Sequence, residues 1–254
     1  MVGWLEEPSW EPVGLASGLK PQTAEQANCR GVDLAIWCGQ DGDFHAWENR
    51  CPHRGMRLSY GFVRENVLTC LYHGWRYDGS GSCVAIPAHP ALKPPKTIRV
   101  QRFACEVRNG LIWVAPEWIS APAPSVDGSW IACRSVAMNA SVEAVRDVLT
   151  RKSFPSFAVR RLTSGDDTGA RHSAQMLSSS LVRLHAAGGD QVLCGLQAAA
   201  PAETFVHVLF SLPSRDGDTT QSRLHFAKWA KRLRGFIEEG IFAGDSSQPM
   251  QAAA

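Results

Sequence analysis

Two short loops that carry metal-binding side chains constrain this 254-residue chain more than any other feature. The first loop reads C-P-H-R-G from Cys51, and the second reads C-L-Y-H-G-W from Cys70. Each presents one thiolate and one imidazole, the imidazoles being those of His53 and His73. Such a set can hold two irons that share sulfides, with Cys51 and Cys70 on one iron and His53 and His73 on the other.

A structural zinc site with two Cys and two His ligands is the alternative. The C-x-H spacing argues against zinc, because two or more residues normally separate paired zinc ligands. A glycine also follows each ligand pair, at Gly55 and Gly74. Glycine lets the backbone wrap tightly and direct N–H groups at bridging sulfides. We therefore expect these four ligands to hold a [2Fe–2S] cluster.

The motif C-P-H-R-G, followed by C-L-Y-H-G-W-R-Y-D-G-S-G-S-C-V-A-I-P, resembles the Rieske domain of the ring-hydroxylating oxygenase superfamily. Respiratory Rieske proteins have a second cysteine in each loop, where this chain has Met56 and Tyr72. Trp75 replaces a frequent hydroxyl donor of the respiratory forms. Fewer hydrogen bonds to sulfur stabilise the reduced state less, so we expect a potential toward the lower end of the Rieske range.

The resemblance also implies a mononuclear iron held by two His and one carboxylate. Part of this triad lies, in the family, on a helix with the pattern N-x-x-x-D-x-x-H-x-x-x-x-H. The helix predicted at Ser141–Arg151 falls at that place, and aligning its aspartate with Asp147 puts Glu143 at the Asn position. Thr150 and Pro155 then occupy the two His positions. The missing His ligands argue against a mononuclear Fe(II) and against intrinsic oxygenase activity in this chain.

Asp147 has two interpretations. In the resembled family, an aspartate links the cluster histidines of one subunit to the catalytic site of its neighbour in a trimer, which makes Asp147 a candidate inter-subunit bridge. An exposed helix carboxylate is the alternative. The other histidines of the second half offer no replacement ligand set, because a lone His on a strand is more often packed or exposed than a metal ligand. They are His172, His185, His207 and His225.

Composition and turn signals predict two domains. After an N-terminal arm at 1–9, short strands indicate an all-β Rieske domain over 10–118. Residues 119–129 are rich in Pro, Ser and Ala and are predicted to form a linker. Residues 130–243 are expected to form a shortened oxygenase-like α+β domain, helix-grip-like, with an antiparallel sheet against a long C-terminal helix. A disordered tail is expected at 244–254.

Hydrophobic periodicity locates the individual elements. The last helix is predicted at Ser222–Phe242, and Asn139 or Ser141 is the candidate N-cap of the helix at Ser141–Arg151. The last helix is expected to bury Leu224, Trp229, Leu233, Phe236 and Ile237. Strands are predicted at Asp33–Cys38, Phe44–Trp47, Val67–Cys70, Trp75–Tyr77, Cys83–Ile86, Thr97–Val100, Cys105–Arg108, Leu111–Ala115, Trp130–Met138, Leu181–His185, Gln191–Gln197 and Thr204–Leu212.

Charge and cysteine usage narrow the class further. A net charge of +2 gives no argument for nucleic-acid or membrane partners. The N-terminus lacks a basic segment followed by an apolar run, so we expect no signal peptide and a cytoplasmic location. The cysteines outside the motif are expected to be buried thiols in a reducing compartment: Cys29, Cys38, Cys83, Cys105, Cys133 and Cys194.

Three functions are compatible with these features. The first is a Rieske redox protein that carries electrons for oxygen-dependent hydroxylation or demethylation, lacks its own mononuclear iron and works with a partner subunit. It would form a homotrimer or a mixed trimer with an active homologue and would receive electrons from a ferredoxin or flavin reductase. The second is an active mono- or dioxygenase with non-standard iron ligands. The third is a ligand-binding module whose cluster senses redox state or stabilises the fold.

Overall fold

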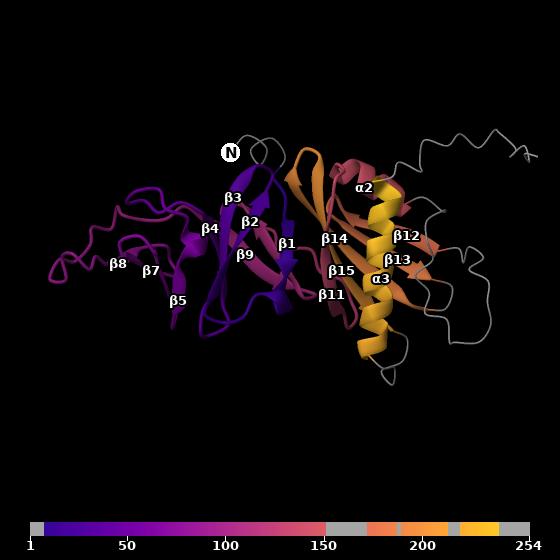
Figure 1. Ribbon diagram of the computed structural model, residues 1–254, viewed down its shortest axis with the longest axis horizontal. Coiled ribbons are helices and arrows are strands. Elements are labelled where there is room, and N and C mark those ends of the chain that lie inside the picture. Colours follow the sequence, from indigo (N-terminus) through magenta and orange to yellow (C-terminus); the bar gives the residue numbers. More distant parts are fainter. Residues whose placement is uncertain (1–7, 151–171, 187–188, 213–218, 239–254) are drawn as a thin grey trace, which may run out of the picture.

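The computed structural model describes residues 8–150, 172–186, 189–212 and 219–238. They form two blocks that lie end to end, with the N-terminal block at one end of the long axis and the helices at the other (Figure 1). The expectations for Pro155, for the arm before residue 8 and for the C-terminal tail fall outside the described residues. Neither helix in the described ranges is long and apolar enough to cross a membrane.

A six-stranded antiparallel sheet forms the body of the first block, in the order β1-β10-β9-β4-β3-β2. The Asn109-Gly110 turn joins β9 to β10, and both of its residues have positive φ, as a two-residue hairpin turn requires. A short 3₁₀ turn at Ala16–Gly18 follows β1. The strands are β1 Glu11–Leu15, β2 Thr23–Cys29, β3 Val32–Cys38, β4 Phe44–Glu48, β9 Arg102–Arg108 and β10 Leu111–Ala115.

A smaller sheet, in the order β5-β6-β7-β8, forms the outer end of this block (Figure 1). The strand predicted at Thr97–Val100 is wrong, because this segment makes only an isolated bridge between Ser82 and Arg99. Pro94 and Pro95 precede it and have no N–H to donate to a ladder. The elements are the 3₁₀ turn Leu58–Tyr60, β5 Phe62–Arg64, β6 Val67–Thr69, β7 Arg76–Asp78 and β8 Cys83–Ala85.

The second block is a five-stranded antiparallel sheet in the order β11-β15-β14-β13-β12, with helices α2 and α3 against it (Figure 1). This confirms the predicted fold class, an all-β domain followed by an α+β domain. Alternate residues of β15, such as Val206 and Val208, join the helices in one apolar core. The elements are β11 Ile131–Met138, α2 Val142–Thr150, β12 His172–Ser178, β13 Leu181–Ala186, β14 Gln191–Ala200, β15 Glu203–Ser211 and α3 Thr219–Glu238.

The apolar face of α3 differs from the predicted one at Leu224, whose side chain is 56% exposed. Leu224 lies about 180° around the helix from Leu233, because nine residues make two and a half turns. Phe236 is half-buried. The face that packs on the sheet consists of Ser222, Phe226, Trp229, Ala230, Leu233 and Ile237.

Helix α2 begins after Ser141, whose hydroxyl accepts the Ala144 N–H at 3.2 Å. Ser141 is therefore the N-cap, one of the two candidates from the sequence. Val145, Val148 and Leu149 are buried against the sheet.

The cysteines outside the two loops are buried at four of six positions, and no disulfide forms among the described residues. Cys105 and Cys133 are only half-buried, contrary to expectation. Cys133 lies at a bulge in β11, where the register shifts between Ala132 and Arg134. A bulge re-aims a side chain and leaves its residue unpaired, which explains the partial exposure.

An apolar cluster joins the two blocks. Residues 119–129, predicted as a linker, contribute to it, since Ala123 is buried and Ile119 and Val126 pack against it. Trp10 also donates its indole N–H to the Ala121 carbonyl at 2.8 Å. The buried residues of the cluster are Trp10, Leu111, Trp113, Ala115, Ala123, Leu181, Leu193 and Leu209.

Polar contacts continue this interface. The Arg30 N–H donates to the Ala198 carbonyl at 2.6 Å, and the Ser180 hydroxyl donates to the Trp10 carbonyl at 3.1 Å. Arg30 also pairs with the buried Glu11 carboxylate at 2.6 Å. Burial raises the pKa of Glu11, and the Arg30 charge opposes that shift. An unpaired buried carboxylate is costly, so Arg30 stabilises the ionised form of Glu11 at this junction.

His207 lies within the same interface and is fully buried. Its Nδ1 accepts from the Ser135 hydroxyl at 2.7 Å, and its Nε2–H donates to Gln197 Oε1 at 2.9 Å. Gln197 in turn donates to the Asn28 carbonyl of the first block at 2.7 Å. The chain of hydrogen bonds uses neutral imidazole, and burial lowers the pKa of His207 to about 4.

We predict a pH-dependent contribution of His207 to stability. The unfolded-state pKa of His207 is near 6.5, so between pH 6.5 and 4 the unfolded chain binds a proton that the folded protein does not bind. The free energy of unfolding therefore decreases as the pH is lowered through this range. The loss amounts to about 3 kcal/mol across that window. Urea unfolding, followed by tryptophan fluorescence at pH 7 and pH 4.5, should show a smaller pH dependence in His207→Gln than in the wild type. The exposed His89→Gln should behave like the wild type, and equal pH dependence in all three proteins would contradict the prediction.

Candidate metal centre

The two ligand loops share one backbone pattern. In the first, the Cys51 N–H donates to the Met56 carbonyl at 2.8 Å, and the Gly55 N–H donates to the Cys51 carbonyl at 2.8 Å. In the second, the Cys70 N–H donates to the Trp75 carbonyl at 2.9 Å, and a glycine N–H four residues on again donates to the cysteine carbonyl, at 3.0 Å. Each cysteine is therefore clamped by two bonds from its own loop, and the two loops are near-copies.

Positive φ at two glycines makes this pattern possible. Gly55 has φ +72° and Gly74 has φ +69°, a region that side chains other than glycine rarely adopt. At Gly74 an added Cβ would also lie 3.1 Å from Cγ of Pro87. Both the turn and the close packing therefore require glycine after the second ligand pair, as the sequence indicated.

Thiols and imidazoles lie at different depths. Cys51 and Cys70 are each 2% exposed and belong to the apolar core between the two sheets of the first block. His53 is half-buried and His73 is exposed. The two imidazole rings lie 4.7 Å apart between centroids, at the outer end of the block. Two sulfur donors face inward, and two nitrogen donors lie together at the surface.

Aromatic rings pack against both histidines. Trp75 stacks on His53 with 4.2 Å between ring centroids and 7° between planes, and Tyr72 lies 3.8 Å from His73. Desolvation lowers the pKa of His53, and the charges of His73 and Arg54 lower it further. These effects favour neutral imidazole, which is the form that binds a metal.

Tyr77 is a further site residue, to which the sequence motif assigned no role. Its hydroxyl lies 3.2 Å from Cys51 Sγ, in a fully buried position on β7. Burial and the nearby Cys51 raise the pKa of Tyr77, so its hydroxyl keeps its proton. A metal-bound Cys51 is a thiolate and can only accept, so Tyr77 is the donor in the metal-loaded protein. The lack of a donor at Trp75 is thus offset in part by a hydroxyl two residues later.

The donor set fits a [2Fe–2S] cluster. A pair of inward thiolates and a pair of outward imidazoles match a binuclear cluster with Cys ligands on one iron and His ligands on the other. Among the described residues, no group of three His, Cys, Asp or Glu side chains is placed to hold one metal ion, whereas each iron here requires only two protein donors. A bound cluster would supply one-electron transfer, and His53 and His73 would provide its nearest protein contact with a partner.

Helix α2 lies in the other block, at the far end of the molecule from these loops (Figure 1). Glu143, Asp147 and Thr150 are exposed on its outer face. Thr150 stands at the sequence position expected for the first His ligand. Its hydroxyl donates to the Arg146 and Asp147 carbonyls of its own helix, each at 3.0 Å.

The other histidines do not assemble into a ligand set within the described residues. His185 pairs in register with Gln191, whereas His207 pairs with Gly195 and with Ser135. His185 and His207 are therefore separated by a strand, and His207 is engaged in the interface between the blocks.

Comparison with known proteins assigns the loops to a domain family. Residues 9–102 match the Rieske [2Fe-2S] domain. Oxidoreductase NdmD of Pseudomonas putida is 30% identical over 231 residues, which are 88% of this chain and 39% of NdmD. Methylxanthine N1-demethylase NdmA of the same species is 47% identical over 109 residues, 41% of this chain and 31% of NdmA. The matched segments thus span well under half the length of each of these relatives.

Solved structures share the fold of this chain. The NdmA structure from Pseudomonas putida CBB5 superposes with a TM-score of 0.72 at 20% identity, covering 96% of this chain and 84% of NdmA. Residues 9–102 of this chain therefore form a Rieske-type [2Fe-2S] domain. Its homologues and structural neighbours lie in the ring-hydroxylating Rieske oxygenase family.

We predict that Tyr77→Phe lowers the reduction potential of the cluster. Removal of one hydrogen bond to Cys51 destabilises the more negative, reduced state by about 1 kcal/mol, or roughly 20–60 mV for one electron. Redox titration followed by electron paramagnetic resonance measures the shift. Tyr60→Phe removes an exposed hydroxyl of the same block and is the control. An unchanged potential in Tyr77→Phe would contradict this role.

We also predict that Cys51→Ser and His73→Ala abolish the Rieske electron paramagnetic resonance signal, because each removes a cluster ligand. Cys83→Ser is the matched control, since Cys83 is buried in the same core but lies on β8, outside both loops. Anaerobically purified protein should keep its iron in the control and lose it in the two ligand variants. Zinc in the wild-type protein, in place of iron and sulfide, would contradict the assignment.

Proposed function

We propose that this chain is a Rieske electron-transfer protein for oxygen-dependent hydroxylation or demethylation, without a mononuclear iron of its own. The proposal rests on the residue at the first aligned ligand position of helix α2. This residue is Thr150, and its hydroxyl is hydrogen-bonded to the backbone of the same helix. A facial triad needs two histidines and a carboxylate with open positions. Neither aligned position supplies a histidine, since the second is Pro155.

The packing of the second block supports the proposal. The space between sheet and helices is filled by fully buried apolar side chains, including Phe210, Phe226 and Trp229. Phe210 and Phe226 stack with 4.5 Å between ring centroids. A close-packed interior of this kind leaves little room for a substrate beside a metal.

The proposal includes a partner subunit, because the cluster loops and α2 lie in different blocks and far apart in the molecule (Figure 1). The cluster histidines would then serve an iron in another subunit, in a homotrimer or in a mixed trimer with an active homologue. Exposed apolar side chains of the first block support such a contact. They are Tyr60, Phe62, Leu71 and Tyr72, with 45–61% of each exposed.

We expect about two irons and two sulfides per chain in protein purified without oxygen. We also expect no hydroxylation or demethylation by this chain alone with a reductase and oxygen. Metal analysis and product analysis test both points, and an active homologue added to the same assay is the positive control. A third iron per chain, or turnover without the homologue, would favour an oxygenase with non-standard ligands instead.

A further inference from the structure

Positive charge is concentrated around the cluster loops. Residues 50–102 contain nine Lys and Arg but only two Asp and Glu, whereas the whole chain has a net charge of +2. This segment thus has a net charge of +7 and the rest of the chain has −5. Such a separation of charge creates a local potential far stronger than the net charge suggests.

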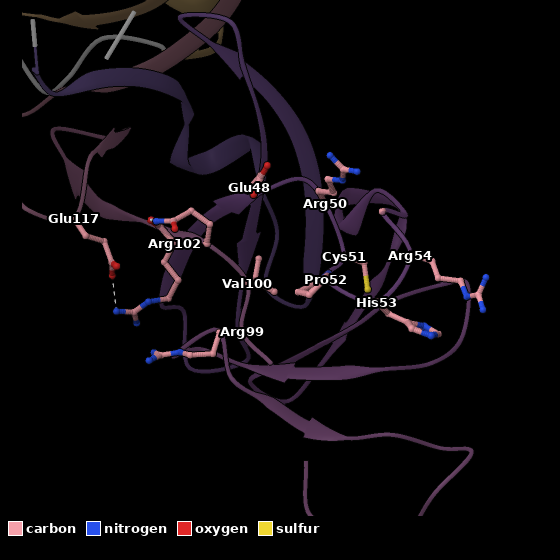
Figure 2. Close-up of a pocket in the computed structure, with 12 residues that line it drawn as sticks. Glu48, Arg50, Cys51, Pro52, His53, Arg54, Arg99, Val100, Arg102 and Glu117 are labelled. Atoms are coloured by element: carbon pink, nitrogen blue, oxygen red, sulfur yellow. Dashed lines mark hydrogen bonds and ion pairs between the residues drawn. The ribbon is translucent and has the colours of Figure 1, made fainter. Parts of the chain in front are cut away.

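Part of this charge borders a groove of about 710 Å³ beside His53. The groove is lined by Arg50 and Arg54 of the ligand loop, by Arg99 of a second segment and by the acidic Glu48. In Figure 2, Arg54 and Arg99 extend toward opposite sides. All three arginines are exposed, and none of them appears among the ion pairs found between described residues. A fourth arginine of the groove, Arg102, is paired with Glu117 (Figure 2).

The outer end of the first block, called the tip here, has a charged side at the arginine-lined groove and an apolar side at His73. His53 lines the groove, whereas His73 is flanked by the exposed Leu71 and Tyr72. Permanent subunit contacts are apolar, but transient complexes rely on complementary charge for fast association. The two histidines therefore give the cluster two approaches, and the charged one suits a protein that binds, delivers an electron and leaves.

We propose that this groove is the docking surface for an acidic electron-donor protein. The inference rests on the proposed electron-transfer function. The donor's reduced centre loses one electron and the oxidised cluster gains it, with His53 as the nearest contact and no bond made or broken. Arg50, Arg54 and Arg99 attract and orient the donor's carboxylates, because guanidinium groups pair bidentately with carboxylates.

The test uses the cluster-loaded full chain and a plant-type [2Fe–2S] ferredoxin of net negative charge as the probe. Stopped-flow absorbance gives the second-order rate of cluster reduction, and calorimetry gives the affinity for the ferredoxin. The variant Arg54→Gln/Arg99→Gln should lower both about tenfold at low ionic strength and should flatten the salt dependence. Photoreduced 5-deazariboflavin, a small uncharged donor, should reduce the variant and the wild type equally fast.

The matched control is Lys231→Gln/Arg232→Gln, which removes the same charge from the exposed face of α3. The rate of cluster reduction and the affinity for the ferredoxin should both stay within about twofold of the wild-type values. Arg99→Gln alone, which lies outside the ligand loops, should show part of the effect even if Arg54→Gln disturbs the cluster.

Equal losses in the groove and control variants, or no loss in either, would overturn the docking surface while leaving the electron-transfer function intact. Slower reduction by the deazaflavin would overturn it as well, because the effect would then lie in the cluster. A wild-type chain without a Rieske signal would overturn the proposed function and the docking surface together.

Discussion

The two backbone clamps at Cys51 and Cys70 are the constraint on which the metal centre depends. Each clamp uses the same pair of bonds, and each requires a glycine at positive φ. The thiols lie inside an apolar core, so the fold itself meets part of the ordering cost of the site. The imidazoles remain outside because the loops end at the tip of the smaller sheet.

The candidate metal centre lies at the outer end of the first block, away from the second block. The tip offers an arginine-lined side at His53 and an apolar side at His73. Behind it, the six-stranded sheet joins the second block through a continuous apolar cluster and the buried Glu11–Arg30 pair. The two blocks are therefore packed together through a shared interface.

The second block resembles the oxygenases in its fold, but its described interior is a packed hydrophobic core. Fold and chemistry separate here, since an antiparallel sheet with a long helix needs only apolar alternation, whereas an iron site needs particular ligands. Thr150 illustrates the difference, because it continues the helix while its hydroxyl bonds the backbone. The architecture can thus be kept without a histidine at that position.

The sequence by itself predicted four cluster ligands and determined the fold class, because metal ligation and turn geometry depend on residue type at short spacing. It also located helix α2 and narrowed its N-cap to two candidates. Only the tertiary structure decided that Leu224 lies outside the buried face of α3, that Thr97–Val100 is not a strand, and that Tyr77 reaches Cys51. Contacts between segments far apart in sequence leave no local pattern. The groove beside His53 has the same origin, since its arginines come from two segments that only the fold brings together.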